Sequence, residues 1–379
     1  MAAYTFQTIT AAEAAAYNGA ADSLSLGPGA ATQASVAYLA GDQAAVSFGG
    51  LTVNFGSGIF GDLDVGFTGG GMLFVGGAGA DNAAGGAASD ALFGGASADT
   101  LAGGDGSDVL QGNQGADSLS GGAGNDSIFG GQDNDQINLG SAAGEANWTN
   151  GNKGDDTIIA SNGVDTILGG QGNDVVIGGT GGDLIVGNLG DDTIQAASGA
   201  DTLIGEGGYD VMAGGGGADL FVFAAGSSAV DVALADRILD WSTGYRLSVS
   251  VTGGYMELGT PSNAPPPMPA PYDPYGGGYT YAPAMSESDA GRQSSNVVLL
   301  GDDGSAPQAA PSTPSAAEFA AALSSANSAL AGNAALRIIA TQSGPDVTVF
   351  VDTDADHAAD LAIVLTGASL DSIDASNFV

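Results

Sequence analysis

The sequence predicts an all-β protein in which short strands stack as a parallel solenoid. The chain repeats every nine residues, in seven consecutive units over residues 76–138 and in eight more over residues 151–222. An Asp stands at position 6 of all fifteen units, and a bulky apolar side chain stands at position 8 of all but the first, which has Ala83. The 66 glycines among 379 residues far exceed the usual share of about 7% and suit a chain with many tight turns.

Each unit divides into a turn followed by a strand. Glycines at positions 1, 2 and 4 permit the positive φ angles of tight turns. The last three residues are long enough for one short strand with a single inward side chain. Two units therefore make one coil, and successive coils stack. Position 8 is expected to fill the interior with Leu92, Leu101, Leu110, Leu119, Ile128, Ile137, Ile158, Ile167, Val176, Ile185, Ile194, Leu203, Met212 and Phe221.

This interior is thin, because it receives one apolar side chain from every nine residues. Such a core cannot by itself offset an ordering cost of about 1–2 kcal/mol per residue. Stacking also places carboxylates such as Asp108 and Asp126 on one edge, where they repel one another. Calcium between successive loops converts that repulsion into attraction, so we expect folding to be coupled to metal binding. A metal-free glycine-rich linker is the alternative, but it does not explain an Asp in every unit.

The predicted calcium ligands are the position-6 carboxylates. Counting the two blocks separately gives at most about 11 full sites between successive loops. The residues are Asp81, Asp90, Asp99, Asp108, Asp117, Asp126, Asp135, Asp156, Asp165, Asp174, Asp183, Asp192, Asp201, Asp210 and Asp219.

These units resemble the repeats-in-toxin (RTX) family, whose signature GGxGxDxUx appears almost unaltered in GGAGNDSIF (121–129) and GGQGNDVVI (169–177). The resemblance implies a right-handed parallel β-roll that holds Ca²⁺ through position-6 carboxylates and early-loop carbonyls. It also implies export by a type I secretion machinery that reads an uncleaved C-terminal signal. Ala88 and Ser97 replace the position-4 glycine, so the match is weakest beside Asp90 and Asp99.

Residues 1–75 are out of phase with the repeats, and residues 139–150 interrupt them. Thr10 and Glu13 form a capping box that predicts a short helix. Short β-like runs follow at residues 35–38, 44–48, 51–55, 64–67 and 72–75. We expect this region to be a β-rich cap over the first coil, with an independent assembly or anchoring surface as the alternative.

Beyond the repeats, residues 223–255 resemble the β segments that close the rolls of the RTX family. Residues 256–315 are rich in Pro, Gly and Tyr and predict extended backbone. This segment is either a flexible loop or a contact surface for another subunit, formed by Tyr255, Tyr272, Tyr275, Tyr279 and Tyr281.

The C-terminal region, residues 316–379, predicts a helix followed by a β-meander. Ser315 and Glu318 form a second capping box, and Gly332 ends the helix. Strands are expected at residues 336–340, 347–351 and 361–365. The region resembles the C-terminal secretion module of type I-secreted RTX proteins.

One further acidic group is a candidate metal site. Asp352, Asp354 and Asp356 resemble the start of an EF-hand loop, but His357 replaces the glycine and Ile363 replaces the final glutamate. The group is either an additional calcium site or a polar hairpin turn.

Composition excludes several functions. Five Lys and Arg face 43 acidic residues, for a net charge of −38, so neither nucleic acid nor an anionic membrane surface is an expected partner. No run of about 18 apolar residues predicts a membrane span. The chain has no Cys and a single His, which excludes disulfides, Cys catalysis and zinc-protease H-E-x-x-H motifs. No G-x-S-x-G elbow is present, so we expect no enzyme.

We therefore expect a secreted calcium-binding structural protein, located outside the cell or on a bacterial cell surface. It would fold on Ca²⁺ and self-assemble as a homo-oligomer, surface layer, filament or matrix fibre. A monomeric secreted adhesive or calcium-binding module that acts on a host or surface is the alternative.

Overall fold

The computed structural model describes most of the chain, as two compact units, one ending at Gln171 and the other beginning at Gly172. Tyr255 and most of residues 256–315, including the predicted tyrosine contacts, lie outside the described residues. The described residues are 3–18, 23–26, 31–40, 43–61, 65–67, 70–224, 227–231, 233–249, 297–300, 314–332, 337–354, 356–373 and 377–378.

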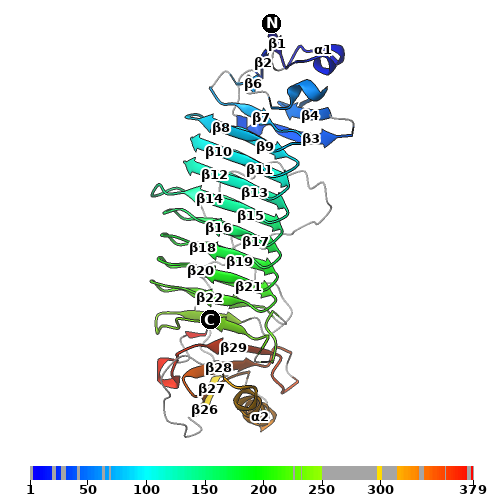
Figure 1. Ribbon diagram of the computed structural model, residues 1–379. Coiled ribbons are helices and arrows are strands. Elements are labelled where there is room, and N and C mark those ends of the chain that lie inside the picture. The colour runs from blue at the N-terminus through cyan, green and yellow to red at the C-terminus, as the bar shows by residue number, and fades with distance from the viewer. Residues whose placement is uncertain are drawn as a thin grey trace. The chain divides into compact units, whose positions relative to one another are not determined.

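In both units the repeats form the stacked coils of a parallel β-roll, which confirms the predicted fold class (Figure 1). Each coil gives one strand to each of two sheets. In the first unit, one sheet contains β8 (Asn82–Gly86), β10 (Thr100–Asp105), β12 (Ser118–Ala123), β14 (Gln136–Gly140) and β16 (Thr157–Ile159). The other contains β7 (Leu73–Val75), β9 (Ala91–Gly95), β11 (Val109–Gln114), β13 (Ser127–Gln132), β15 (Trp148–Lys153) and β17 (Thr166–Gln171).

Position 8 faces the interior of the roll, as predicted. Leu101 pairs with Leu119 on the next strand of its sheet, and both are 1% exposed. Leu110 and Ile128 pair in the same way on the other sheet and are fully buried. The apolar side chains therefore stack in columns along each sheet.

Residues 139–150 do not interrupt the solenoid, which corrects the prediction. Strand β15 pairs in parallel with both β13 and β17, and Thr149 lies between Ile128 and Ile167 in the register. Thr149 is fully buried and occupies the place of a position-8 apolar residue. The segment is a repeat unit with three extra residues, and sequence reasoning missed it because Thr and Asn stand where Ile and Asp are usual.

The N-terminal residues cover the first coil. Thr10 caps α1 (Ala11–Ala15) through the predicted capping box with Glu13. The short strands β1 (Ala3–Thr5), β2 (Ser23–Ser25) and β6 (Val65–Gly66) form a parallel sheet, and β3 (Ser35–Leu39), β4 (Gln43–Phe48) and β5 (Leu51–Phe55) form an antiparallel one. Short 3₁₀ turns lie at Ala31–Gln33 and Ser57–Ile59.

The N-terminal core joins the cap to the roll. Phe48 packs edge-on against Phe67, with ring centroids 5.0 Å apart. The same buried cluster includes Leu73 and Phe93 from the first strands of the roll. The described residues of this region thus shield apolar side chains that the first coil would otherwise expose.

The second unit continues with the same two kinds of sheet. One contains β18 (Val175–Ile177), β20 (Thr193–Gln195), β22 (Val211–Ala213) and β24 (Asp236–Ile238). The other contains β19 (Leu184–Leu189), β21 (Thr202–Gly207), β23 (Leu220–Phe223) and β25 (Arg246–Val249). Strands β24 and β25 extend the sheets beyond the last nonapeptide, as predicted for residues 223–255.

The C-terminal module adds strands to the first of these sheets. Beside β24 lie β29 (Leu361–Leu365), β28 (Asp346–Val351), β27 (Ile338–Ser343) and β26 (Val297–Leu300), in that order. A 3₁₀ turn follows at Leu370–Ser372. The three predicted strands are confirmed, whereas β26 lies within residues 256–315, where no strand was predicted.

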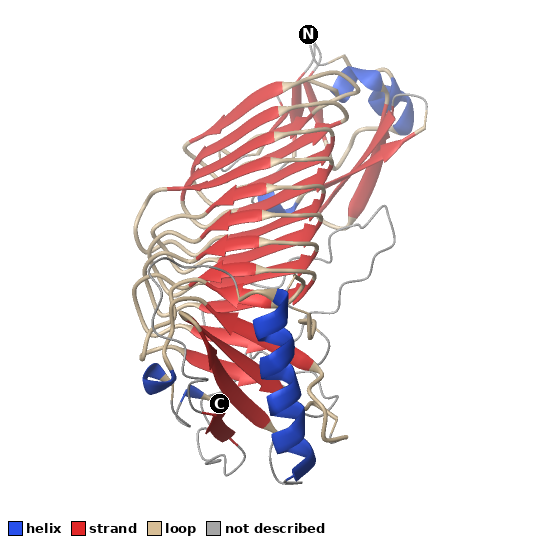
Figure 2. Cartoon of the chain, turned by 60° about the horizontal axis from the view of Figure 1, so that its bottom comes forward, coloured by secondary structure: helices blue, strands red, loops and turns tan. Residues whose placement is uncertain are grey.

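Helix α2 (Ala316–Gly332) packs against these C-terminal strands (Figure 2). Its N-terminus has the predicted capping box, in which the Glu318 N–H donates to Ser315 Oγ at 3.2 Å and the Ser315 N–H donates to Glu318 Oε2 at 2.8 Å. Its buried face carries Phe319 and Leu330 and joins Phe350 of β28 in one core. No helix within the described ranges is both long and apolar enough to span a membrane.

Candidate metal centres

The position-6 carboxylates line up in rows within each unit. The backbone N–H of Asp90 donates to Oδ1 of Asp108 at 2.8 Å, and the N–H of Asp108 donates to Oδ1 of Asp126 at 2.9 Å. In the second unit, Asp174 donates to Asp192 and Asp192 to Asp210 by the same bond. Each carboxylate is therefore tied to the preceding coil by one of its two oxygens.

The second oxygen of these carboxylates points into a buried space. Apart from Asp81, these residues are 0–2% exposed, and a buried anion without hydrogen-bonding or charged partners is strongly unfavourable. Oδ2 is buried and accepts no hydrogen bond within the described part of the chain in Asp90, Asp99, Asp108, Asp117, Asp126, Asp135, Asp192, Asp201 and Asp210.

Position-1 glycines form the wall of this space. A Cβ added to Gly187 would lie 2.9 Å from the carbonyl oxygen of Gly205 and still closer to Oδ2 of Asp192. The glycine therefore leaves room where a carboxylate oxygen and a carbonyl oxygen of the next coil converge. Oxygen donors around a small space form the environment that Ca²⁺ prefers.

Burial raises the pKa of several of these carboxyl groups, including those of Asp135 and Asp192. For Asp192 the pKa rises from 3.8 to about 8, first because of burial and then because of the charges of Asp174 and Asp210. For Asp135 it rises to about 8, through burial and the neighbouring Asp156 and Asp117. A cation bound between the coils would remove both causes, since it replaces water and neutralises the neighbours.

Two predicted ligands have a different environment. Asp81 is partly exposed, and its Oδ2 accepts the N–H of Gly77 at 2.7 Å. In the unit of Asp165, Ser161 donates to Oδ2 through both its N–H and its hydroxyl. Protein donors thus already reach these two oxygens, whereas Asp90 and Asp99 share the arrangement of the other repeats despite Ala88 and Ser97.

Asp236 belongs to the same arrangement, although sequence reasoning missed it. The backbone N–H of Asp210 donates to its Oδ1 at 2.9 Å, and its Oδ2 is buried without a hydrogen-bond donor in the described residues. Burial, followed by the charge of Asp210, raises its pKa to about 8. The N–H of Asp236 donates to Ser228 Oγ at 2.8 Å, so a serine ends the row. The signal in the sequence was Asp-Arg-Ile, which repeats the D-x-U pattern outside the nonapeptide phase.

A second polar ladder runs beside the carboxylates at position 5. The N–H of Asp191 donates to Oδ1 of Asn173, and the N–H of Tyr209 donates to Oδ1 of Asp191, both at 2.8 Å. These bonds run opposite to the position-6 bonds, so each loop is fixed to both neighbouring coils. Polar residues recur at position 5, and this recurrence could have predicted the second ladder.

The acidic group near the C-terminus is brought together as predicted. Carboxylate oxygens of Asp352, Asp354 and Asp356 lie within 4.8 Å of one another. His357 has a φ of 70°, the conformation that the EF-hand glycine provides. Arg337 lies 3.2 Å from Asp352 and supplies positive charge there, so the arrangement fits a turn as well as a metal site.

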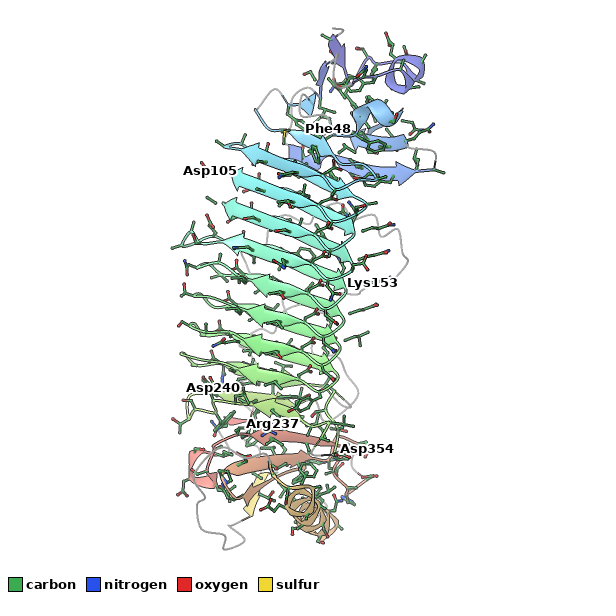
Figure 3. The ribbon with its side chains drawn as sticks, viewed as in Figure 1. Phe48, Asp105, Lys153, Arg237, Asp240 and Asp354 are labelled. Carbon is green, nitrogen blue, oxygen red and sulfur yellow. The ribbon has the colours of Figure 1, made fainter. Side chains whose placement is uncertain are left out.

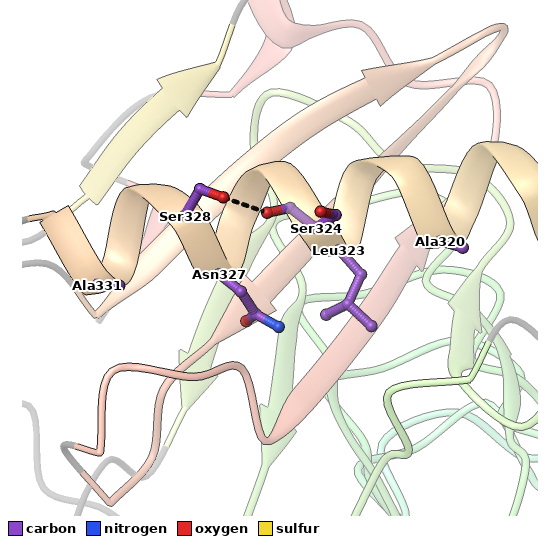
Figure 4. Close-up of a pocket in the computed structure, with 6 residues that line it drawn as sticks. All are labelled: Ala320, Leu323, Ser324, Asn327, Ser328 and Ala331. Carbon is purple, nitrogen blue, oxygen red and sulfur yellow. Dashed lines mark hydrogen bonds between the residues drawn. The ribbon is translucent and has the colours of Figure 1, made fainter.

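A surface pocket on α2 offers no comparable chemistry. It is lined by Ala320, Leu323, Ser324, Asn327, Ser328 and Ala331 (Figure 4). Ser328 Oγ donates to the backbone oxygen of Ser324 at 2.8 Å, and none of the lining side chains titrates or carries charge.

The similarity of the chain to a known protein family agrees with this geometry. No curated protein matches the chain. The family model of the RTX calcium-binding nonapeptide repeat (4 copies) matches residues 75–110, 111–143, 150–185, 177–212 and 186–221. These segments carry the buried carboxylate rows, so residues 75–143 and 150–221 of the chain form an array of RTX-type calcium-binding nonapeptide repeats.

Proposed function

We propose that the protein is a secreted, non-enzymatic structural protein that folds on calcium outside the cell and then assembles with copies of itself. The observation that carries the proposal is the burial of carboxylates in stacked rows, with side chains 0–2% exposed. Without a cation the rows repel, so the roll is unstable where calcium is scarce. Extracellular calcium-binding modules have dissociation constants of about 10⁻⁴–10⁻³ M. Because such weak sites fill only where calcium is abundant, folding would wait until export by a type I machinery.

Self-assembly is supported by the first unit. The antiparallel sheet β3–β4–β5 has β3 and β5 as its edges. Leu39 on β3 is 38% exposed and Leu51 on β5 is 45% exposed. Exposed apolar edge strands readily pair with another chain, so these edges would join copies into a filament, surface layer or matrix fibre.

Electron microscopy and sedimentation of the purified full-length chain test the proposal, first in millimolar calcium and then after chelation. Ordered filaments or sheets that dissolve on chelation are expected. Dispersed single particles in calcium would overturn self-assembly and leave a monomeric secreted adhesive or calcium-binding module. Replacing Leu39 and Leu51 by Lys should abolish assembly while leaving calcium-induced folding intact, because both leucines lie on the surface.

A further inference from the structure

The unit at residues 139–150 breaks the row of carboxylates at one point. Asn147 occupies the position-6 place, since the N–H of Asp126 donates to its Oδ1 at 2.8 Å and its own N–H donates to Asp165 at 2.9 Å. The Asn147 amide also donates to Ser161 Oγ at 3.2 Å. The backbone geometry of the row is preserved, but one negative charge is missing beside Asp126.

Glu145 supplies a carboxylate to the same loop. It stands at the position-4 place of this unit, where glycine is found in twelve of the fifteen nonapeptides. Its Oε1 accepts the N–H of Gly124 at 2.6 Å, and its Oε2 is buried without a hydrogen-bond partner in the described chain.

The corresponding N–H groups elsewhere have a different acceptor. Gly106 donates to the carbonyl oxygen of Ala123 at 2.7 Å, and Gly190 donates to that of Gly207 at 2.8 Å. In both cases the acceptor is the position-3 carbonyl of the next coil. At Gly124 the Glu145 carboxylate takes the place of this carbonyl, so a charged oxygen donor enters a loop that elsewhere presents only backbone there.

Asp126 brings a second buried carboxylate to this loop. Asp126 is 1% exposed, and its Oδ2 has no hydrogen-bond donor among the described residues. This oxygen lies against Gly121, where an added Cβ would also meet the carbonyl oxygen of Leu139 at 3.1 Å. Gly124, whose N–H donates to Glu145, lies two residues before Asp126 in the same loop. Two buried carboxylates held by one loop destabilise each other without a cation.

We propose that Asp126 and Glu145 bind a calcium ion together, and that Glu145 replaces the charge lost at Asn147. The ion would have oxygen donors from both carboxylates and from the Leu139 carbonyl, a ligand set suited to a hard divalent cation. The proposal rests on calcium binding by the repeats. It adds that the unit with three extra residues contains a site of its own composition, which keeps the stack cemented at that point.

The test is calcium binding to the full-length protein carrying Glu145→Gln, measured by isothermal titration calorimetry. Gln retains an oxygen for the Gly124 N–H, so the substitution removes the charge and keeps the hydrogen bond. We expect the loss of one calcium ion per chain, or a weakening of that site by about tenfold, because calcium affinity follows ligand charge. Glu318→Gln is the control, since Glu318 is an exposed glutamate of α2 outside the repeats, where Gln also completes the capping box, and it should leave the stoichiometry unchanged.

A rescue variant separates charge compensation from simple damage. Adding Asn147→Asp to Glu145→Gln restores a position-6 carboxylate beside Asp126, and the lost calcium should return. Wild-type stoichiometry and affinity in Glu145→Gln would overturn the inference, as would a loss that Asn147→Asp fails to restore. If the wild-type protein itself bound no calcium, the function of the whole array would fail instead, so the two failures are distinguishable.

Discussion

The backbone N–H of Asp210 donates to Oδ1 of Asp236 at 2.9 Å, across 26 residues of sequence instead of the usual 18. The carboxylate row thus continues past the last nonapeptide into β24, which is also the strand that joins the C-terminal module through β29. A cation bound at this point would connect the folding of the repeats to that of the module.

Replacing Asp236 by Asn should therefore weaken calcium binding and also destabilise the C-terminal module. We expect about tenfold weaker calcium binding at the end of the row and a lower melting temperature of the C-terminal module in calcium. Calorimetry and thermal unfolding measure the two effects. Asp371→Asn, an exposed aspartate of the same module, is the control. Unchanged binding and melting in the Asp236 variant would show that this carboxylate is not part of a metal site.

A methyl group in the wall of the site should interfere with calcium binding. In Gly187→Ala the new Cβ would lie closer than 3.0 Å to the Asp192 carboxylate, and such overpacking costs about 1–3 kcal/mol. Gly79→Ala is a matched control from the same repeats, since nothing lies within 4 Å of its added Cβ. Urea unfolding in calcium should show a lower stability for Gly187→Ala than for Gly79→Ala. Equal stabilities would contradict the role of Gly187 in the wall of the calcium site.

The stability of the metal-free protein should decrease as the pH rises. The raised carboxyl pKa values mean that the folded state binds more protons than the unfolded state between about pH 4 and pH 8, so the free energy of unfolding falls across this range. Calcium competes with those protons, so its affinity should rise over the same range. With chelator, circular dichroism should show more strand at about pH 5 than at about pH 8. With calcium, the free energy of unfolding in urea should not fall over the same range. Equal strand signals at the two pH values with chelator would contradict the repulsion between the carboxylates.

One buried ion pair should stabilise the C-terminal module independently of calcium. Arg237 on β24 (Figure 3) lies 3.8 Å from Asp346 and donates to Thr366 Oγ1 at 3.1 Å. Removing one partner of a buried pair typically costs about 3–5 kcal/mol, so Arg237→Gln should lower the melting temperature with and without calcium. Arg246→Gln, at an exposed arginine of β25, should have little effect. A loss seen only in calcium would assign Arg237 to the metal sites instead.

The nonapeptide phase made most of the fold predictable. Asp at position 6 and Leu or Ile at position 8 recur so regularly that sheets, interior and carboxylate rows follow from the spacing, as Leu101 and Leu119 show by pairing in the predicted register. The capping boxes at Thr10 and Ser315 were predictable because the hydrogen bonds that define them are local.

Most of the features that could not be predicted depend on contacts between distant residues. Thr149 and Asn147 fill repeat places only because three extra residues are accommodated in a loop, and no local signal fixes where an insertion is absorbed. Asp236 joins the row through a strand pairing outside the phase. Ser161 occupies the oxygen of Asp165, a contact within the unit that the spacing of Asp residues does not reveal.

Calcium between the carboxylate rows is expected to hold the roll together. A calcium titration of the metal-free full-length protein at neutral pH, followed by far-ultraviolet circular dichroism, tests it most directly. Little strand signal without calcium and a cooperative gain of strand on addition are expected, with the gain lost on chelation. A full strand signal and the same melting temperature with and without calcium would contradict the claim.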